Sequence, residues 1–155
     1  MESVGIGDTG RVDAGDVVAA LGMRPHPEGG WYVETWRSPA DDPGARPAVS
    51  SILYLLAAGD RSHWHRVDAA EIWQHAGGNA LELRVWAEGD PAVTAHRLAD
   101  DLAPGSVLQA AVPASAWQAA RPLGDWALVG CIVAPAFEFA GFELAAEDWE
   151  PPVKG

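Results

Sequence analysis

Short apolar segments, separated by breaks rich in Gly, Pro and Asp, follow one another through this sequence from Trp31 onward. No segment after residue 22 keeps a helical period of 3.6 residues over three turns, and the 17 Gly and 12 Pro fit many tight turns. The pattern therefore predicts β-strands rather than helices. The predicted strands are 31–37, 49–57, 63–66, 70–76, 80–87, 92–98, 106–112, 115–120, 126–133 and 137–144.

Ten short strands in one chain predict an antiparallel sandwich or barrel. The segments SSILYLLAA and WALVGCIVA are apolar on both faces, which is typical of layered sheets or of a barrel packed against a partner. Before the strands, Asp13 can cap a short helix over residues 14–21, and Gly22 can end it. We therefore expect an all-β domain over residues 13–145 with one short N-terminal helix. Residues 1–12 are expected to form a flexible tail, and residues 146–155 a C-terminal tail.

The charge of the chain argues against two classes of partner. The 155 residues include 22 acidic and ten Lys or Arg residues, a formal net charge of −12. Phosphate backbones and anionic lipid head groups would repel such a surface, so we expect neither a nucleic-acid nor a membrane partner. No basic segment followed by an apolar one stands at the start, which predicts a cytoplasmic protein. The single Cys131 excludes an intramolecular disulfide and is expected to be a buried thiol.

Three of the five His residues lie in the stretch RSHWHRVDAAEIWQH, residues 61–75. Alternate residues of a strand share a face, so His63 and His65 should point the same way. If the next strand completes a hairpin, Glu71 can join them inside a barrel mouth. Two imidazoles and a carboxylate form a set that binds Fe, Mn, Ni or Zn. His75, on the same face as Glu71, adds a group that titrates near neutrality, and either of the two could carry a proton in catalysis.

Other side chains have simpler interpretations. Trp73 and Trp117 are candidate apolar walls of the pocket, although most of the eight Trp residues should be core. His26 and His96 have no partner at strand or helix spacing, and we expect both at the surface. No Gly-x-Ser-x-Gly motif accompanies the Ser residues, which argues against a Ser-His hydrolase.

The His cluster and its surroundings resemble the cupin superfamily. The pattern of Gly59, His63, His65, Glu71 and Gly78 is similar to the first cupin signature, although the first gap is short and the turn before the glutamate is one residue longer. More of the chain resembles the small single-domain cupins of unassigned function. The motifs that carry this resemblance are HPEGGWYVETWRS, SSILYLL, SHWHRVDAAEIWQHAGG, VPASAWQAAR and LVGCIVAPAFEF.

The resemblance implies a double-stranded β-helix, the cupin jelly roll, with a small-molecule pocket at the barrel mouth and a homodimeric assembly. The second cupin signature usually supplies a histidine, and Gln118 stands at the matching position. Gln118 would be a weak metal ligand that hydrogen-bonds well. The resemblance also places Tyr32 and Glu34 near the pocket, and Ser51 is predicted to line it. For the Glu28-Gly29-Gly30 run we weigh close approach of backbone to a ligand against a simple turn, and favour the turn.

Two classes of function remain open from the sequence. The first is an isomerase, epimerase or lyase that uses a divalent metal held by His63, His65 and Glu71. A metal-independent variant would use His63 or His65 as the base, like the sugar epimerases that share the fold. The second is a protein that binds a small, sugar-like metabolite without converting it.

Overall fold

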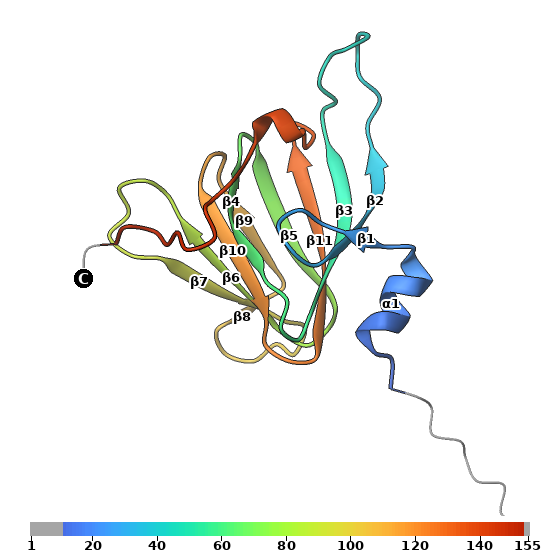
Figure 1. The fold of residues 1–155 in the computed structure, drawn as a ribbon, viewed down its shortest axis with the longest axis vertical. Coiled ribbons are helices and arrows are strands. Elements are labelled where there is room, and N and C mark those ends of the chain that lie inside the picture. The colour runs from blue at the N-terminus through green and yellow to red at the C-terminus, as the bar shows by residue number, and fades with distance from the viewer. Residues whose placement is uncertain (1–10, 154–155) are drawn as a thin grey trace, which may run out of the picture.

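Two six-stranded sheets face each other in the computed structural model, which describes residues 11–153 (Figure 1). Sheet A contains, in spatial order, β1 (Arg24–Pro25), β2 (Trp31–Arg37), β3 (Ser50–Ala57), β11 (Trp126–Ala134), β5 (Ala70–Gly78) and β9 (Gln109–Val112). Sheet B contains β12 (Phe142–Leu144), β4 (Ser62–Val67), β10 (Trp117–Pro122), β6 (Leu81–Trp86), β7 (Thr94–Leu98) and β8 (Ser106–Val107). All the strand pairs are antiparallel except β7 with β8. The prediction of an all-β chain with one short N-terminal helix is confirmed.

The helix α1 (Ala14–Leu21) begins and ends where its capping residues predict. The Asp13 carboxylate accepts a hydrogen bond from the Asp16 backbone N–H, and the Asp16 side chain accepts one from the Asp13 backbone. Gly22 ends the helix in the left-handed conformation, with a φ of 63°. Within residues 11–153, no helix is long and apolar enough to cross a membrane. The expected tail 1–12 lies almost wholly outside the described residues.

Apolar side chains fill the space between the sheets and also cover part of the outer face of sheet A. The inner core includes buried Tyr54, Trp73 and Leu83. On the outer face, Val17 of α1 packs against Leu55 of β3 in a second cluster. This second layer explains why the segments of β3 and β11 are apolar on both faces: one face meets the opposite sheet, and much of the other meets the helix and neighbouring aromatic residues.

Two predicted strands differ from the observed ones. The segment 106–112 divides into β8, which pairs with β7 in sheet B, and β9, which pairs with β5 in sheet A. A hydrophobic pattern reports burial, and it cannot report that the chain changes sheets. The segment 137–144 contains the 3₁₀ turn η1 (Phe139–Gly141) before the short strand β12. Its apolar signal comes from three Phe rings that pack on one another rather than from a long strand.

A cluster of four Trp residues covers the outer face of sheet B. Trp149 packs at a ring-centroid distance of 4.5 Å from Trp117, and within 6.3 Å of Trp64 and Trp86. The Trp64 indole N–H donates to Glu150 at 2.9 Å, and before this position the chain pairs with β4 as the edge strand β12. The segment expected to be a C-terminal tail is therefore packed on the sheet through residue 150.

Trp149 is expected to contribute strongly to stability. Trp149→Ala removes the ring on which the other three rings pack, so it should lower the free energy of unfolding by about 2–4 kcal/mol. Trp36 is a matched control because it is 56% exposed on β2, and Trp36→Ala should cost less than about 1 kcal/mol. Denaturant unfolding followed by far-UV circular dichroism measures both. Equal losses in the two variants would contradict a structural role for the C-terminal segment.

Candidate functional site

A cavity of about 120 Å³ opens between the two sheets. Its size is close to that of cavities of about 150 Å³ that hold benzene, so it suits a molecule of few heavy atoms. The lining combines acidic, imidazole and apolar side chains from both sheets and from the loop between β1 and β2. The lining residues are His26, Glu28, Tyr32, Glu34, Arg37, Ser50, Ile52, His65, Val67, Glu71, Cys131, Val133, Phe137 and Phe139.

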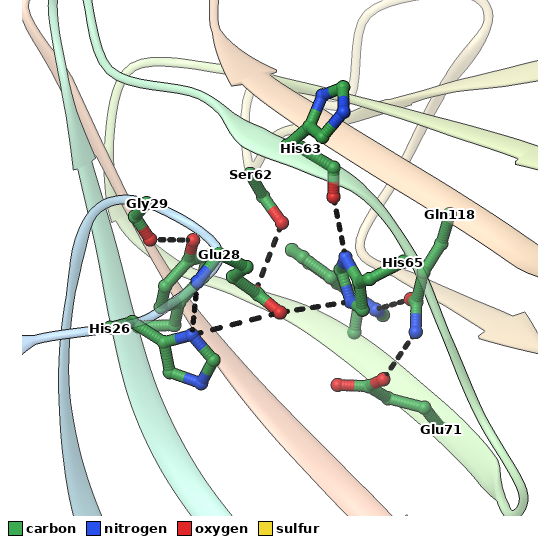
Figure 2. A network of polar contacts seen from close by, with 10 residues as sticks. His26, Glu28, Gly29, Ser62, His63, His65, Glu71 and Gln118 are labelled. Atoms are coloured by element: carbon green, nitrogen blue, oxygen red, sulfur yellow. Dashed lines mark hydrogen bonds and ion pairs between the residues drawn. The ribbon is translucent and has the colours of Figure 1, made fainter. Parts of the chain in front are cut away.

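A β-bulge in β4 decides which side chains of the His cluster reach this cavity. His65 pairs with Gln118 and Ser62 pairs with Ala120, so two residues of β4 lie opposite one residue of β10. The extra residue breaks the alternation of faces, because both Ser62 and His65 now point inward. His63 is turned away from His65 (Figure 2). Its Nε2 lies 2.8 Å from the carbonyl oxygen of Ala146. The prediction that His63 and His65 share a face is wrong for this reason.

Glu28 is the partner that His65 meets inside the cavity. His65 Nε2 lies 3.1 Å from Glu28 Oε2, and both side chains are buried. The Ser62 hydroxyl donates to the other oxygen, Oε1, at 3.0 Å. On its far side, His65 Nδ1 lies 2.7 Å from the backbone carbonyl oxygen of His63, which can only accept, so Nδ1 carries a proton. His63 therefore orients the ring of His65 through its backbone rather than its side chain (Figure 2).

The Glu28–His65 pair holds one proton between its two facing atoms. Burial raises the pKa of Glu28, and burial also lowers the pKa of His65, because a low-dielectric site disfavours both charged forms. With Nδ1 protonated, a neutral His65 presents the Nε2 lone pair to Glu28, and the carboxyl then carries the proton. Transfer of that proton gives an imidazolium beside a carboxylate. The pair is therefore a proton donor and acceptor that stays near neutral in total charge.

The loop that carries Glu28 depends on the two glycines that follow it. A Cβ on Gly29 would lie 2.0 Å from the Arg61 carbonyl oxygen, and one on Gly30 would lie 2.7 Å from that of Leu55. The loop therefore packs directly on neighbouring backbone and carries Glu28 inward. The segment is the expected turn into β2, closed by a hydrogen bond from the Gly29 N–H to the His26 carbonyl oxygen at 3.0 Å, whereas the expectation of a surface His26 is wrong. The His26 side chain is only 7% exposed, and its Nδ1 accepts a hydrogen bond from the Glu28 backbone N–H at 3.2 Å.

Glu71 lines the same cavity as the Glu28–His65 pair and takes its hydrogen bond from a different residue. Gln118 Nε2 donates to Glu71 Oε2 at 2.7 Å, and Gln118 Oε1 accepts from the Trp73 indole N–H at 2.7 Å. An indole N–H can only donate, so it determines which end of the amide faces the carboxylate. Burial raises the pKa of Glu71 from 4.5 to about 7, while His65 and the amide act in the opposite direction. The carboxyl is therefore poised to gain or lose a proton near neutral pH.

The remaining predicted site residues divide into two groups. Tyr32 and Glu34 line the cavity as predicted, and Ser50 lines it where Ser51 was expected. Trp73 lies behind Gln118, in the core, and Trp117 belongs to the cluster on the outer face of sheet B. His75 points into the core two positions further along β5 than Trp73, where its Nε2 lies 2.9 Å from the Asn79 carbonyl oxygen. A catalytic role for His75 has no support from its position.

The residues do not fit the predicted metal site. Throughout residues 11–153, no three His, Cys, Asp or Glu side chains form a group that could hold a metal ion. The predicted set fails because the side chain of His63 leaves the cavity and because the amide nitrogen of Gln118, rather than its oxygen, faces Glu71. An amide nitrogen donates a hydrogen bond and offers no lone pair to a metal.

Comparisons with known proteins agree with the two-sheet fold. The profile of the family described as Cupin superfamily (DUF985) matches residues 15–145. The chain belongs to this cupin family, as its sequence motifs predict. A protein of Shewanella oneidensis is 37% identical, with a TM-score of 0.81 over 88% of this chain and 86% of that one. A hypothetical protein from Leishmania major is 28% identical, with a TM-score of 0.76 over 85% and 86% of the two chains.

More distant matches establish only the fold. A variant of the oxalate decarboxylase of B. subtilis is 13% identical, with a TM-score of 0.59 over 78% of this chain and 29% of that protein. A search of curated proteins gives no match. The jelly-roll fold is therefore shown, and the chemistry of the cavity has to be argued from its residues.

Glu71 predicts a pH dependence of stability with a definite sign. Its pKa is about 7 when folded and 4.5 by default, so between these values the folded chain binds more protons at this carboxyl. The stabilisation is complete below about pH 4.5 and is lost as the pH rises to 7. The stability of the wild type relative to Glu71→Gln should therefore fall by about 2–3 kcal/mol between pH 5 and pH 8.

Denaturant unfolding at the two pH values measures this difference. Glu82→Gln is the matched control, because Glu82 lies outside the cavity and pairs with Arg121 at 2.9 Å. The difference in the free energy of unfolding between Glu82→Gln and the wild type should be the same at both pH values. If the difference between Glu71→Gln and the wild type is also the same at both pH values, the raised pKa of Glu71 is contradicted.

Proposed function

We propose that this chain is an enzyme that moves protons on a small polar molecule without a metal ion, as an isomerase, epimerase or lyase. The observation that carries the proposal is the Glu28–His65 contact of 3.1 Å in a cavity that Glu71 also lines. Two acid–base groups, the Glu28–His65 pair and Glu71, thus face one small space. Such an arrangement is what catalysis needs when a proton leaves one atom of a substrate and another is supplied elsewhere.

Glu71 is suited to the role of base. As a carboxylate it can accept a proton from a substrate carbon next to a carbonyl group, so that a C–H bond breaks and an O–H bond forms. The amide of Gln118 stabilises the charged form before the transfer, and the surrounding apolar groups keep water out. A pKa of about 7 places this base near the operating pH, where proton transfer in both directions is efficient.

The Glu28–His65 pair is suited to supply the second proton. As negative charge develops on the substrate oxygen, the pair donates the proton that it holds, and the remaining negative charge stays delocalised over Glu28, which keeps its hydrogen bond from Ser62. Delivery of the first proton from Glu71 to a different carbon of the substrate, together with return of a proton from another substrate hydroxyl to the pair, completes an isomerisation and restores both groups. His63 would contribute only through its backbone carbonyl, which orients the ring of His65.

The same cavity would also suit a protein that binds a small molecule without converting it. A metal-dependent enzyme is the less favoured alternative, because the residues do not form a metal site. A pure binding site needs complementary contacts but has no need of two groups that exchange protons near neutral pH. The homodimer and the cytoplasmic location that the sequence leads us to expect stay predictions.

Proton exchange with solvent tests the proposal without knowledge of the substrate. In deuterium oxide, the protein should introduce one deuterium into a particular compound of a small-metabolite extract, detected by mass spectrometry. His65→Gln and Glu28→Gln should reduce the exchange rate by roughly 10²–10⁴-fold, the usual contribution of a general acid–base group. His63→Gln is the matched control, and it should retain activity because its side chain lies outside the cavity.

Equal losses in the His63 and His65 variants would contradict this assignment of roles. Absence of exchange in every compound, together with a saturable ligand, would instead support the binding protein.

Metal removal separates the two enzyme hypotheses. Dialysis against a strong chelator should leave the exchange rate and the midpoint of thermal unfolding unchanged, since no step depends on a metal ion. Loss of exchange after chelation, with recovery on adding Fe, Mn, Ni or Zn, would restore the metal-dependent alternative. Elemental analysis of protein prepared without a histidine tag provides the control.

A further inference from the structure

The charges that line the cavity are unequal. Arg37 is the one basic Lys or Arg side chain among the described lining residues. Its Nε and Nη2 donate to Glu34 at 3.3 and 3.1 Å, and Nη2 also donates to the Phe137 carbonyl oxygen at 3.0 Å. The Arg37–Glu34 pair is therefore neutral overall, and its hydrogen-bonding groups are already used within the protein.

Glu71 makes no ion pair within the part of the chain that the structure describes, although His65 lies close enough to lower its pKa. Burial lowers the pKa of His65, so its imidazole is neutral at the pH where Glu71 is ionised. The Glu28–His65 pair balances its own charge, and the partner of Glu71 on the protein side is the neutral amide of Gln118. An ionised carboxylate with no counter-ion in an apolar site carries a desolvation cost that a hydrogen bond only partly offsets. A positively charged group on a ligand would offset the rest, whereas an anionic ligand would add repulsion.

The walls of the cavity favour the same kind of ligand. The rings of Tyr32, Phe137 and Phe139 line it, and the two Phe rings lie 5.0 Å apart in an edge-to-face arrangement. Aromatic faces attract cations, and apolar side chains lower the local dielectric constant and so strengthen an ion pair. The cavity volume of about 120 Å³ limits the enclosed part of the ligand to a few heavy atoms.

From these contacts we infer that the cavity binds a small primary amine in its ammonium form, with the ammonium group paired to Glu71. This inference names the substrate class of the proposed function and rests on the same cavity, but it concerns ligand charge rather than turnover. An amino-substituted carbonyl compound would satisfy both the amine preference and the proposed proton transfer. Its ammonium group would hold it beside the side chains that move protons.

Three probes of nearly equal size test the inference: ethanolamine, ethylene glycol and glycolate, which are a cation, a neutral molecule and an anion at pH 8. Titration of isotope-labelled protein, followed by NMR, gives each affinity. Ethanolamine should bind at least tenfold more tightly than ethylene glycol, and glycolate should bind no better than the diol. Tighter binding of the diol or of glycolate would overturn the inference.

A matched pair of variants locates the charge. Glu71→Gln removes it with little change in shape and should weaken ethanolamine binding at least tenfold, while ethylene glycol changes less than threefold. Glu82→Gln, on the outer surface beside Arg121, removes an equal charge outside the cavity and should alter neither affinity. Unchanged ethanolamine binding in the Glu71 variant would overturn the inference.

The wild-type protein supplies a measurement that does not depend on the folding of a variant. Lowering the pH from 8 to 5.5 protonates Glu71, so ethanolamine should lose at least tenfold in affinity, while the diol should not. The titratable groups that face Glu71 are His65 from β4, Glu28 from the β1–β2 loop and Cys131 from β11. Protonation of His65 would oppose the cation as well, so it acts in the same direction. An ethanolamine affinity that does not fall would overturn the inference.

The two proposals can fail separately. Deuterium exchange confined to neutral or anionic compounds would contradict the amine preference and leave the acid–base function intact. Selective binding of ethanolamine without exchange in any compound would leave the ligand class intact and contradict the enzyme.

Discussion

One extra residue in β4 determines the chemistry of this cavity. Because two residues of β4 lie opposite one residue of β10, Ser62 and His65 both face inward, and His63 faces the C-terminal segment. A regular strand would have placed two imidazoles in the cavity and left Glu28 without its hydroxyl donor. The bulge thus turns the imidazole of His63 out of the cavity and brings the Ser62 hydroxyl into contact with the buried carboxyl of Glu28. The Glu28–His65 pair and the lack of a three-ligand group among residues 11–153 both follow from this change of register.

Burial controls the electrostatics of the site, and each carboxyl is compensated differently. Glu28 is balanced by His65, with which it holds one proton. Glu71 receives a hydrogen bond from the neutral Gln118 amide, so its charged form remains costly and its pKa rises. Burial raises the pKa of both carboxyls, and what separates them is the partner of each, an imidazole for Glu28 and an amide for Glu71. Trp73 supports this separation from the core, since its indole N–H orients the amide.

Local patterns predicted a large part of this structure. Alternation of apolar residues located most strands, and Asp13 and Gly22 located the ends of the helix. Tyr32 and Glu34 were found through the family motif that contains them. Glu28 was visible as part of the same motif, next to a glycine pair. The sequence predicts the turn at these two glycines but not its contacts with the backbone of residues 55 and 61, because those contacts join segments that are distant in the sequence.

Short-range periodicity and residue type were enough to predict most of the strands, the helix, the family and a pocket with acidic and histidine side chains. Only the tertiary structure decided which side chains meet in that pocket. The bulge lies where β4 pairs with a strand more than fifty residues later, and the loop that carries Glu28 meets the start of β4. The side chain of His63 contacts the C-terminal segment instead of the cavity. Such contacts depend on register between distant strands, and a shift of one residue reverses the face on which a side chain lies.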